Sequence, residues 1–187
     1  MRTISLVPEF GRVEVGQLRT FDNAAFRKAT RDSLLTSGVP RFILGLDASL
    51  NHDDGKPDEA HFQFQWWGFF EEPDGPWRER LKALVNPSRI VRRPIKVITP
   101  DSLEAAAAYG LKNTFKRRVS CVKTNLDRDD RGACRNTNDR LLRGDAWIEL
   151  MIFLDRIGLE NRLLGYGVTI PFKPLRSRKP SKSEVGQ

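Results

Sequence analysis

The sequence predicts an α+β fold in which helices flank an antiparallel sheet, and three observations predict it. Residues 42–51 and 60–70 alternate apolar and polar side chains with a period of two, which is the pattern of a half-buried strand. Residues 23–36 instead carry an apolar side between helix-capping residues. Hydrophobic residues make up 39% and charged residues 30% of the 187 residues, a composition typical of one soluble globular domain.

The N-terminal elements come first. Short apolar patches predict one or two short strands within residues 4–18. Asp22 or Asn23 is expected to cap the helix over residues 23–36, because their side chains can accept hydrogen bonds from its first turn. Gly38 is expected to end it, because glycine tolerates the left-handed conformation common after a helix.

The two alternating stretches are expected to form a hairpin. Residues 52–58 between them are rich in Asp, Gly and Pro, which favour tight turns. The apolar face of the second strand carries Phe62, Phe64, Trp66 and Phe70, enough aromatic area to anchor a core. Asp47 then shares the opposite face with His61 and Gln63. Registers that place Asp47 opposite His61, Gln63 or Gln65 all preserve these faces, so the register stays open.

The second half of the chain continues the alternation of helices and strands. The predicted elements are a helix over 77–85, a strand within 92–99, a helix over 105–115 that starts with Asp101 as cap and Glu104 in its first turn, a loop over 117–137 with a short strand at 119–122, a helix over 139–155, and a short helix at 161–164. The order of elements favours a ferredoxin-like sandwich around an antiparallel sheet. We expect a single domain over residues 1–172, with a C-terminal helical extension, and a basic disordered tail over residues 173–187.

The charge of the chain indicates its partners. The net charge is +8 and the isoelectric point is near 9.9, which favours phosphate-rich partners through counterion release. A basic tail that only aids solubility is the alternative. No apolar run approaches the roughly 20 residues that a membrane span needs, so we expect no membrane partner. The two cysteines, Cys121 and Cys134, are expected to be free thiols in a reducing cytoplasm.

The polar face of the predicted hairpin offers a metal site. Asp47 supplies a carboxylate, His61 an imidazole nitrogen and Gln63 a carbonyl oxygen. Such a mixed set with open positions suits Mg²⁺ or Mn²⁺. Zn²⁺ would be expected to recruit more His or Cys, and the chain has only two histidines. An ion at this site could withdraw charge from the oxygens of a phosphodiester.

Tyr109 is the candidate nucleophile for such a phosphodiester. Lys112 lies one helical turn further along, so both side chains share one side of the predicted helix. Its ammonium could stabilise the phenolate or neutralise charge on the phosphate. Attack by the tyrosine would leave a covalent 5′-phosphotyrosine and a free 3′-hydroxyl, so the nick could be resealed.

These residues resemble a known group, the HUH endonucleases, in the single-tyrosine form that initiates rolling-circle replication. The resemblance rests on His61-Phe62-Gln63, because some members carry Gln at the second histidine position, on Tyr109-Gly110-Leu111-Lys112, and on the order of elements over about residues 24–115. It implies an enzyme that cleaves and joins single-stranded DNA at a replication origin of a plasmid, phage or related element. It also implies that Asp47 is the carboxylate from the neighbouring strand, that single-stranded or hairpin origin DNA is the partner, and that a host helicase is a further candidate partner.

Basic and aromatic side chains outside this constellation are candidates for contacts to nucleic acid. Trp67 shares the polar face of its strand and could stack an unpaired base. The candidate phosphate contacts are Arg92, Arg93, Lys96, Lys116, Arg117 and Arg118. For the first three residues the alternative is a charged strand edge that prevents aggregation.

Two other functions remain open at this point. A noncatalytic relative of replication proteins would bind nucleic acid in a salt-sensitive way without cleaving it. A structural protein whose polar sheet face binds another protein would show little affinity for single strands.

Overall fold

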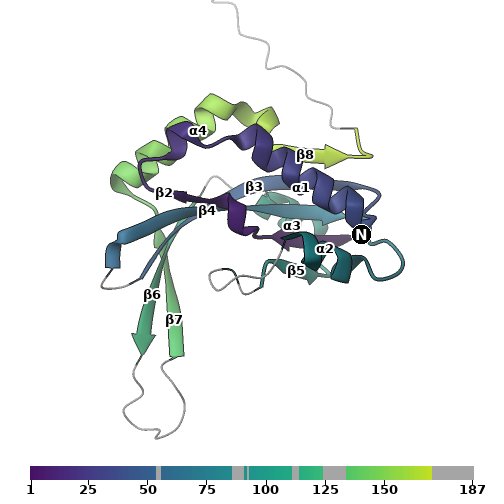
Figure 1. Ribbon diagram of the computed structural model, residues 1–187, viewed down its shortest axis with the longest axis horizontal. Helices are drawn as coiled ribbons and strands as arrows, with labels where there is room; N and C mark the ends of the chain where they lie inside the picture. The colour runs from purple at the N-terminus through teal and green to yellow at the C-terminus, as the bar shows by residue number, and fades with distance from the viewer. Residues whose placement is uncertain (54–55, 86–90, 92, 111–113, 124–133, 170–187) are drawn as a thin grey trace, which may run out of the picture.

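The computed structural model describes residues 1–53, 56–85, 91, 93–110, 114–123 and 134–169. Within this part of the chain, an eight-stranded sheet is flanked by four α-helices, so the predicted α+β class is confirmed (Figure 1). The sheet is mixed, and not antiparallel throughout as predicted, because β3 and β6 pair parallel. The predicted tail over residues 173–187 lies outside the described residues.

A long central hairpin organises the sheet. Its strands are β3 (Phe42–Asp53) and β4 (Lys56–Phe70), which pair antiparallel from Phe42 opposite Phe70 to Asp53 opposite Lys56. Two shorter strands pair along the outer edge of each hairpin strand. The strands beside β4 are β1 (Arg2–Leu6) and β2 (Arg12–Glu14), and those beside β3 are β8 (Leu163–Tyr166) and β6 (Lys116–Lys123). The outer strands are β5 (Ile95–Ile98), paired with β1, and β7 (Cys134–Leu141), paired with β6. Only the β3–β6 pairing is parallel among these ladders.

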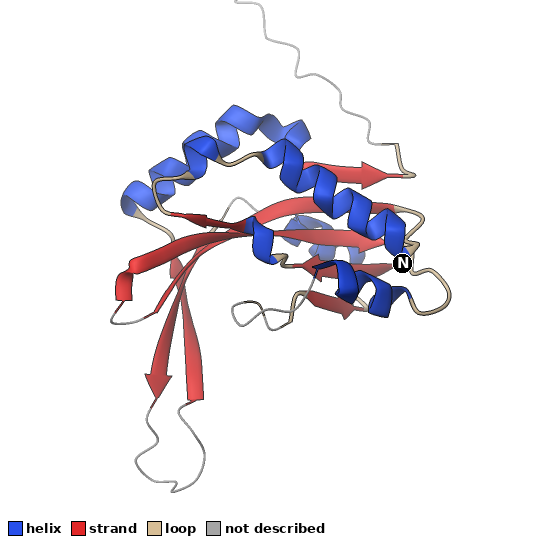
Figure 2. Ribbon diagram, viewed as in Figure 1, coloured by secondary structure: helices blue, strands red, loops and turns tan. Residues whose placement is uncertain are grey.

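One face of the sheet is apolar and carries three of the helices. These are α1 (Asn23–Ser37), α2 (Trp77–Val85) and α4 (Gly144–Asn161). Each of these helices contributes one aromatic ring that packs against an aromatic ring of β4. Phe26 of α1 lies 5.7 Å from Trp66, measured between ring centroids. The same distance is 5.1 Å for Phe153 of α4 and Phe64, and 5.1 Å for Trp77 of α2 and Phe70. Figure 2 shows α1 passing in front of the strands while the remaining helix, α3 (Leu103–Gly110), lies behind them.

The ends of α1 agree with the sequence. The Asp22 side chain accepts a hydrogen bond from the Ala25 amide at 2.9 Å, which confirms it as the cap. Gly38 follows the helix with φ of 94°, in the left-handed region that favours glycine. The Arg80 side chain of α2 donates two hydrogen bonds, at 3.0 and 2.8 Å, to the Ser37 carbonyl, so the same helix end is also tied to α2.

The start of α3 corrects a prediction. Ser102, rather than Asp101, caps the helix, because its hydroxyl accepts from the Ala105 amide at 3.1 Å. The hydroxyl also donates to the Glu104 carboxylate at 2.9 Å. Both residues can cap a helix, and the motif spacing alone did not distinguish them. The described helix runs from Leu103 to Gly110, and residues 111–113 lie outside the described part. The predicted end at residue 115 is wrong, because Thr114 and Phe115 are not helical and lead directly into the strand that starts at Lys116.

The largest correction concerns the predicted loop over residues 117–137. The short strand expected at residues 119–122 lies within the longer β6, and residues from 134 onward form β7, while residues 124–133 lie outside the described part of the chain. The two strands make an antiparallel ribbon that projects from the sheet (Figure 1). Most residues of this ribbon are polar, so its sequence lacks the long apolar alternation that marks a half-buried strand. The predicted helix over 139–155 begins later, as α4 at Gly144, because residues 134–141 belong to β7.

The predicted short helix at residues 161–164 is also wrong. Leu163 to Tyr166 form β8, and Leu164 pairs with Leu44 of β3. This short apolar run could not be assigned from periodicity alone, because four residues fit a helix or a strand equally well.

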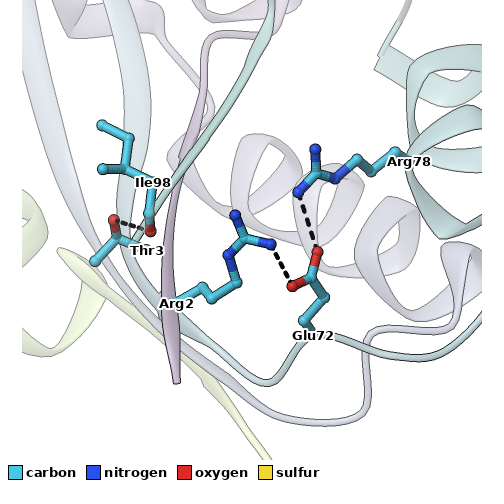
Figure 3. A network of polar contacts seen from close by, with 5 residues as sticks. All are labelled: Arg2, Thr3, Glu72, Arg78 and Ile98. Atoms are coloured by element: carbon cyan, nitrogen blue, oxygen red, sulfur yellow. Dashed lines mark hydrogen bonds and ion pairs between the residues drawn. The ribbon is translucent and has the colours of Figure 1, made fainter. Parts of the chain in front are cut away.

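Polar side-chain contacts help to hold β1 between β5 and β4 (Figure 3). The Glu72 carboxylate lies 2.5 Å from the Arg2 guanidinium and 3.0 Å from that of Arg78 in α2. The Thr3 hydroxyl donates to the Ile98 carbonyl of β5 at 3.1 Å. β1 is therefore held by side chains as well as by its ladders to β4 and β5. None of the described helices is long and apolar enough to cross a membrane.

Candidate functional site

The candidate site lies on the sheet face that carries α3, which we call the α3 face. Side chains of residues paired across strands point to the same face, so the ladders show which residues are neighbours there. One row across the strands consists of Arg12, Gln63, Ser49 and Lys116. The next row consists of Glu14, His61, Asn51 and Arg118. Two predicted metal ligands and two predicted phosphate contacts are therefore in adjacent rows.

Gln63 occupies the gap between β1 and β2. Its side-chain amide donates to the Pro8 carbonyl at 2.9 Å and to the Phe64 carbonyl at 3.1 Å. The side chain is buried, and its Oε1 atom has no hydrogen-bond partner in the described part of the chain. These amide contacts fix the orientation of the carboxamide, so the carbonyl oxygen is held in place as a ligand would be.

Asp47 lies further from His61 than the sequence could reveal. The register places Asp47 opposite Gln65, four positions along β4 from His61, or about 13 Å at the usual rise of a strand. Its carboxylate is buried and accepts from the Gln65 amide at 2.5 Å and from the Ala48 backbone amide at 2.9 Å. This geometry does not bring Asp47 and His61 to one ion.

Glu14 is the carboxylate that the sequence reasoning missed. It lies directly opposite His61 in the β2–β4 ladder, where Cβ atoms are about 5 Å apart. Its Oε1 is 3.1 Å from the Arg12 guanidinium, and its side chain is exposed. The three-residue strand β2 gave no strong periodic signal, so only the pairing of β2 with β4 could identify this residue.

Tyr109 lies at the end of α3, on the same sheet face. Its ring meets the ring of Trp67 edge-on, with centroids 4.9 Å apart, and its side chain is 42% exposed. The neighbours of Trp67 across the strands are the small residues Ser5 and Gly45. The phenol is thus held by an aromatic contact and still open to a ligand. Lys112, its predicted partner, lies outside the described residues.

Lys116 is the described cation associated with Tyr109. The hydrogen bond and charge of Asp139, whose carboxylate is 2.9 Å from the Lys116 ammonium, raise the pKa of Lys116, and the Tyr109 phenol adds to this increase. The three groups therefore share one electrostatic neighbourhood on the α3 face. Tyr109 itself also makes a contact with other residues of the protein.

The other predicted phosphate contacts do not all lie on the α3 face. Arg117 points to the opposite face, where its Nε donates to His52 Nε2 at 2.6 Å, while Arg118 points to the α3 face. Lys96 is exposed on the α3 face, opposite Ser5. Arg93 is exposed just before β5, and Arg92 lies outside the described residues.

The two rows contain side chains that could serve as ligands for a hard divalent cation. No three His, Cys, Asp or Glu side chains come together within the described ranges, but the predicted site takes one ligand from an amide. The buried Oε1 of Gln63 is an oxygen of the kind that Mg²⁺ and Mn²⁺ accept, with His61 two positions away and Glu14 opposite His61.

Comparisons of the chain with protein-family models, with curated proteins and with solved structures find no match.

Proposed function

We propose that this protein cleaves and joins single-stranded DNA through Tyr109, with Mg²⁺ or Mn²⁺ bound by His61, Gln63 and a nearby carboxylate. The observation that carries the proposal is that an exposed tyrosine and the candidate metal ligands lie on the same sheet face. Tyr109 contacts Trp67, and Gln63 and His61 lie four and six positions before Trp67 on β4. The Gln63 oxygen has no hydrogen-bond partner among the described residues. The position of Glu14 makes it the better candidate for the carboxylate, and Asp47 the weaker one.

The chemistry requires a nucleophile and charge stabilisation. The Tyr109 oxygen would attack phosphorus as the phenol gives up its proton, and the bond from phosphorus to the 3′ oxygen would break. The departing 3′ oxygen takes up a proton and becomes a hydroxyl, while the 5′ phosphate remains esterified to Tyr109. Attack by a 3′-hydroxyl on that ester reverses the reaction and joins the strand. A bound Mg²⁺ or Mn²⁺ supplies Lewis-acid withdrawal of charge from the phosphate oxygens.

Two neighbouring groups assist this step in our proposal. The Lys116 ammonium would stabilise the negative charge that builds on the phosphate oxygens. Trp67, which already contacts the tyrosine ring, would stack the base next to the cleaved bond.

We also propose a ferredoxin-like arrangement for the unit from β1 to β5. It is supported by the order β5-β1-β4-β3, by antiparallel pairing throughout these four strands, and by α1 and α2 packing on the same face. The resemblance to rolling-circle initiators also favours this arrangement.

The experiment is an adduct assay with labelled single-stranded oligonucleotides that include candidate origin hairpins. With Mn²⁺ or Mg²⁺ we expect a protein–DNA adduct that survives denaturation and is lost in EDTA and in Tyr109→Phe. Tyr166→Phe is the matched control, because Tyr166 lies in β8 and stacks on Phe42, away from the α3 face. An adduct that persists in Tyr109→Phe would assign the nucleophile to another residue.

A noncatalytic nucleic-acid-binding protein is the second candidate. The buried hydrogen bonds of Asp47 and of the Gln63 amide favour it, because they give these polar groups a purely structural use. It predicts salt-sensitive retardation of single strands and no adduct with any metal ion.

A further inference from the structure

The alternation of β6 places two of its cations on the α3 face. Lys116 lies opposite Ser49 and Arg118 opposite Asn51, beside the positions of Gln63 and His61 on the next strand. A strand that bound phosphates through these cations would therefore run next to the candidate metal ligands. Arg117, between them, is turned to His52 on the other face.

A single carboxylate on β7 engages both cations. Asp139 pairs with Arg118 in the β6–β7 ladder. Its Oδ2 is 2.9 Å from the Lys116 ammonium, and its Oδ1 is 3.8 Å from the Arg118 Nε. Two oxygens that bridge an ammonium and a guanidinium resemble the non-bridging oxygens of a phosphodiester in charge and in acceptor geometry.

A phosphate can replace the Asp139 carboxylate at little cost in stability. The Asp139 side chain is 40% exposed, and ion pairs at such positions add little to stability. A nucleic-acid phosphate that approaches Lys116 and Arg118 also gains from the release of its own counterions, which a fixed carboxylate cannot provide.

We propose that Asp139 occupies the place of a nucleic-acid phosphate on the α3 face: it holds Lys116 and Arg118 and releases them to the backbone of a bound single strand. The inference rests on the proposed function for its ligand. Asp139 thereby weakens binding and keeps Lys116 and Arg118 ordered on the α3 face until a strand arrives.

The chain offers a matched control for this proposal. Asp32 of α1 also engages two cations, with its carboxylate 2.6 Å from the Lys28 ammonium and 3.5 Å from the Arg31 Nε, and its side chain is 43% exposed. α1 packs on the opposite face of the sheet. Asp32→Asn therefore repeats the change in net charge and the release of two cations, away from the candidate site.

The test is the affinity for a fluorescent single-stranded oligonucleotide over a series of salt concentrations, with EDTA to prevent cleavage. We expect Asp139→Asn to tighten binding by about fivefold and to steepen the plot of log affinity against log salt by up to about 0.7, the increment for one more neutralised phosphate. Asp32→Asn is expected to tighten binding less than about twofold, because its charge lies on the far face. Asp139→Glu, which keeps the competing carboxylate, should bind like the wild type.

Equal effects of Asp139→Asn and Asp32→Asn would overturn the proposal, because net charge alone would then explain them. Weaker binding by Asp139→Asn would also overturn it, since the carboxylate would then help the two cations bind. The adduct assay separates this inference from the proposed function. If the wild type forms a protein–DNA adduct but Asp139→Asn and Asp32→Asn change DNA affinity equally, the inference about Asp139 fails and the proposed nicking reaction stands. If Asp139→Asn binds DNA more tightly than Asp32→Asn does but no adduct forms, the inference stands and the nicking reaction fails. Absence of binding by every variant would defeat both.

Discussion

At the scale of single residues, two carboxylates on the α3 face have different environments. Asp47 is buried and satisfies the Gln65 amide, while Glu14 is exposed and faces His61. We expect Asp47→Ala to lower the free energy of unfolding by about 1–3 kcal/mol, because it leaves buried donors without an acceptor. Mn²⁺ affinity should change little. Chemical denaturation and calorimetric Mn²⁺ titration measure the two quantities.

Glu14→Gln should leave the free energy of unfolding nearly unchanged and should weaken Mn²⁺ binding. An exposed substitution changes stability by less than about 0.5 kcal/mol. Loss of one ligand charge should weaken Mn²⁺ binding by about tenfold or more. If Asp47→Ala weakens Mn²⁺ binding and Glu14→Gln does not, Asp47 is the metal ligand after all.

The Glu72 carboxylate gives a prediction about pH. The hydrogen bond from Arg2 and then that from Arg78 hold the pKa of Glu72 below its ordinary value of 4.5. A lowered pKa in the folded state means that the stabilisation is present above pH 4.5 and is lost as the pH falls through the lower folded value. At pH 7 the wild type should therefore exceed Glu72→Gln in unfolding free energy by up to about 1 kcal/mol. Urea titrations at pH 7 and at pH 3 should show this difference shrinking, and a difference that grows on acidification would contradict the assignment.

At the scale of elements, the β3–β4 hairpin depends on one glycine. A Cβ added at Gly68 would lie 2.2 Å from the Ile43 carbonyl oxygen and 2.8 Å from the Leu44 Cα, and backbone atoms in the middle of a sheet cannot move aside. Gly68→Ala is therefore expected to cost about 3 kcal/mol or more. Gly75→Ala is the control, because φ is 79° there but no atom lies within 4 Å of the added Cβ, so only about 1 kcal/mol is expected. Equal losses in thermal unfolding would show that Gly68 tolerates the added atom.

The sequence predicted the elements whose signals are local and strong. α1 has a cap at each end, and β3 and β4 have long alternating patterns, so the hairpin and its two faces were predictable. The register was not, because a shift of two residues preserves both faces. That register decides whether Asp47 lies near His61, whereas the position of Glu14 depends on the β2–β4 ladder.

The sequence also could not show which of the predicted phosphate contacts share one face of the sheet. Once residues 116–123 are known to be a strand, simple alternation separates Arg117 from Lys116 and Arg118. A short strand was expected only at residues 119–122, because the residues before it and those of β7 are mostly polar in the sequence. Tyr109 and Trp67 were both candidates from the sequence, but their contact depends on α3 packing across the sheet, which a sequence pattern does not specify.

At the scale of the whole molecule, the positive charge is expected to act through one face. Replacing Lys116 by Gln should lower the salt dependence of single-strand binding, with the slope of log affinity against log salt falling by about 0.7. Lys28→Gln on α1 makes the same change in net charge and should leave the slope nearly unchanged. The measurement is fluorescence anisotropy over a salt series. Equal slopes for both variants would indicate that the net charge of +8, and not the α3 face, determines binding.

The pairing of β8 with β3 has a consequence for how the protein is made. Leu44 finds its partner in Leu164, so the ribosome must synthesise most of the chain before this ladder can close. Until then, the N-terminal part of β3 has an open edge with apolar side chains, and such edges recruit other strands. During translation the nascent chain therefore passes through a stage at which chaperone binding and aggregation compete for the same segment, and the arrival of β8 ends that competition.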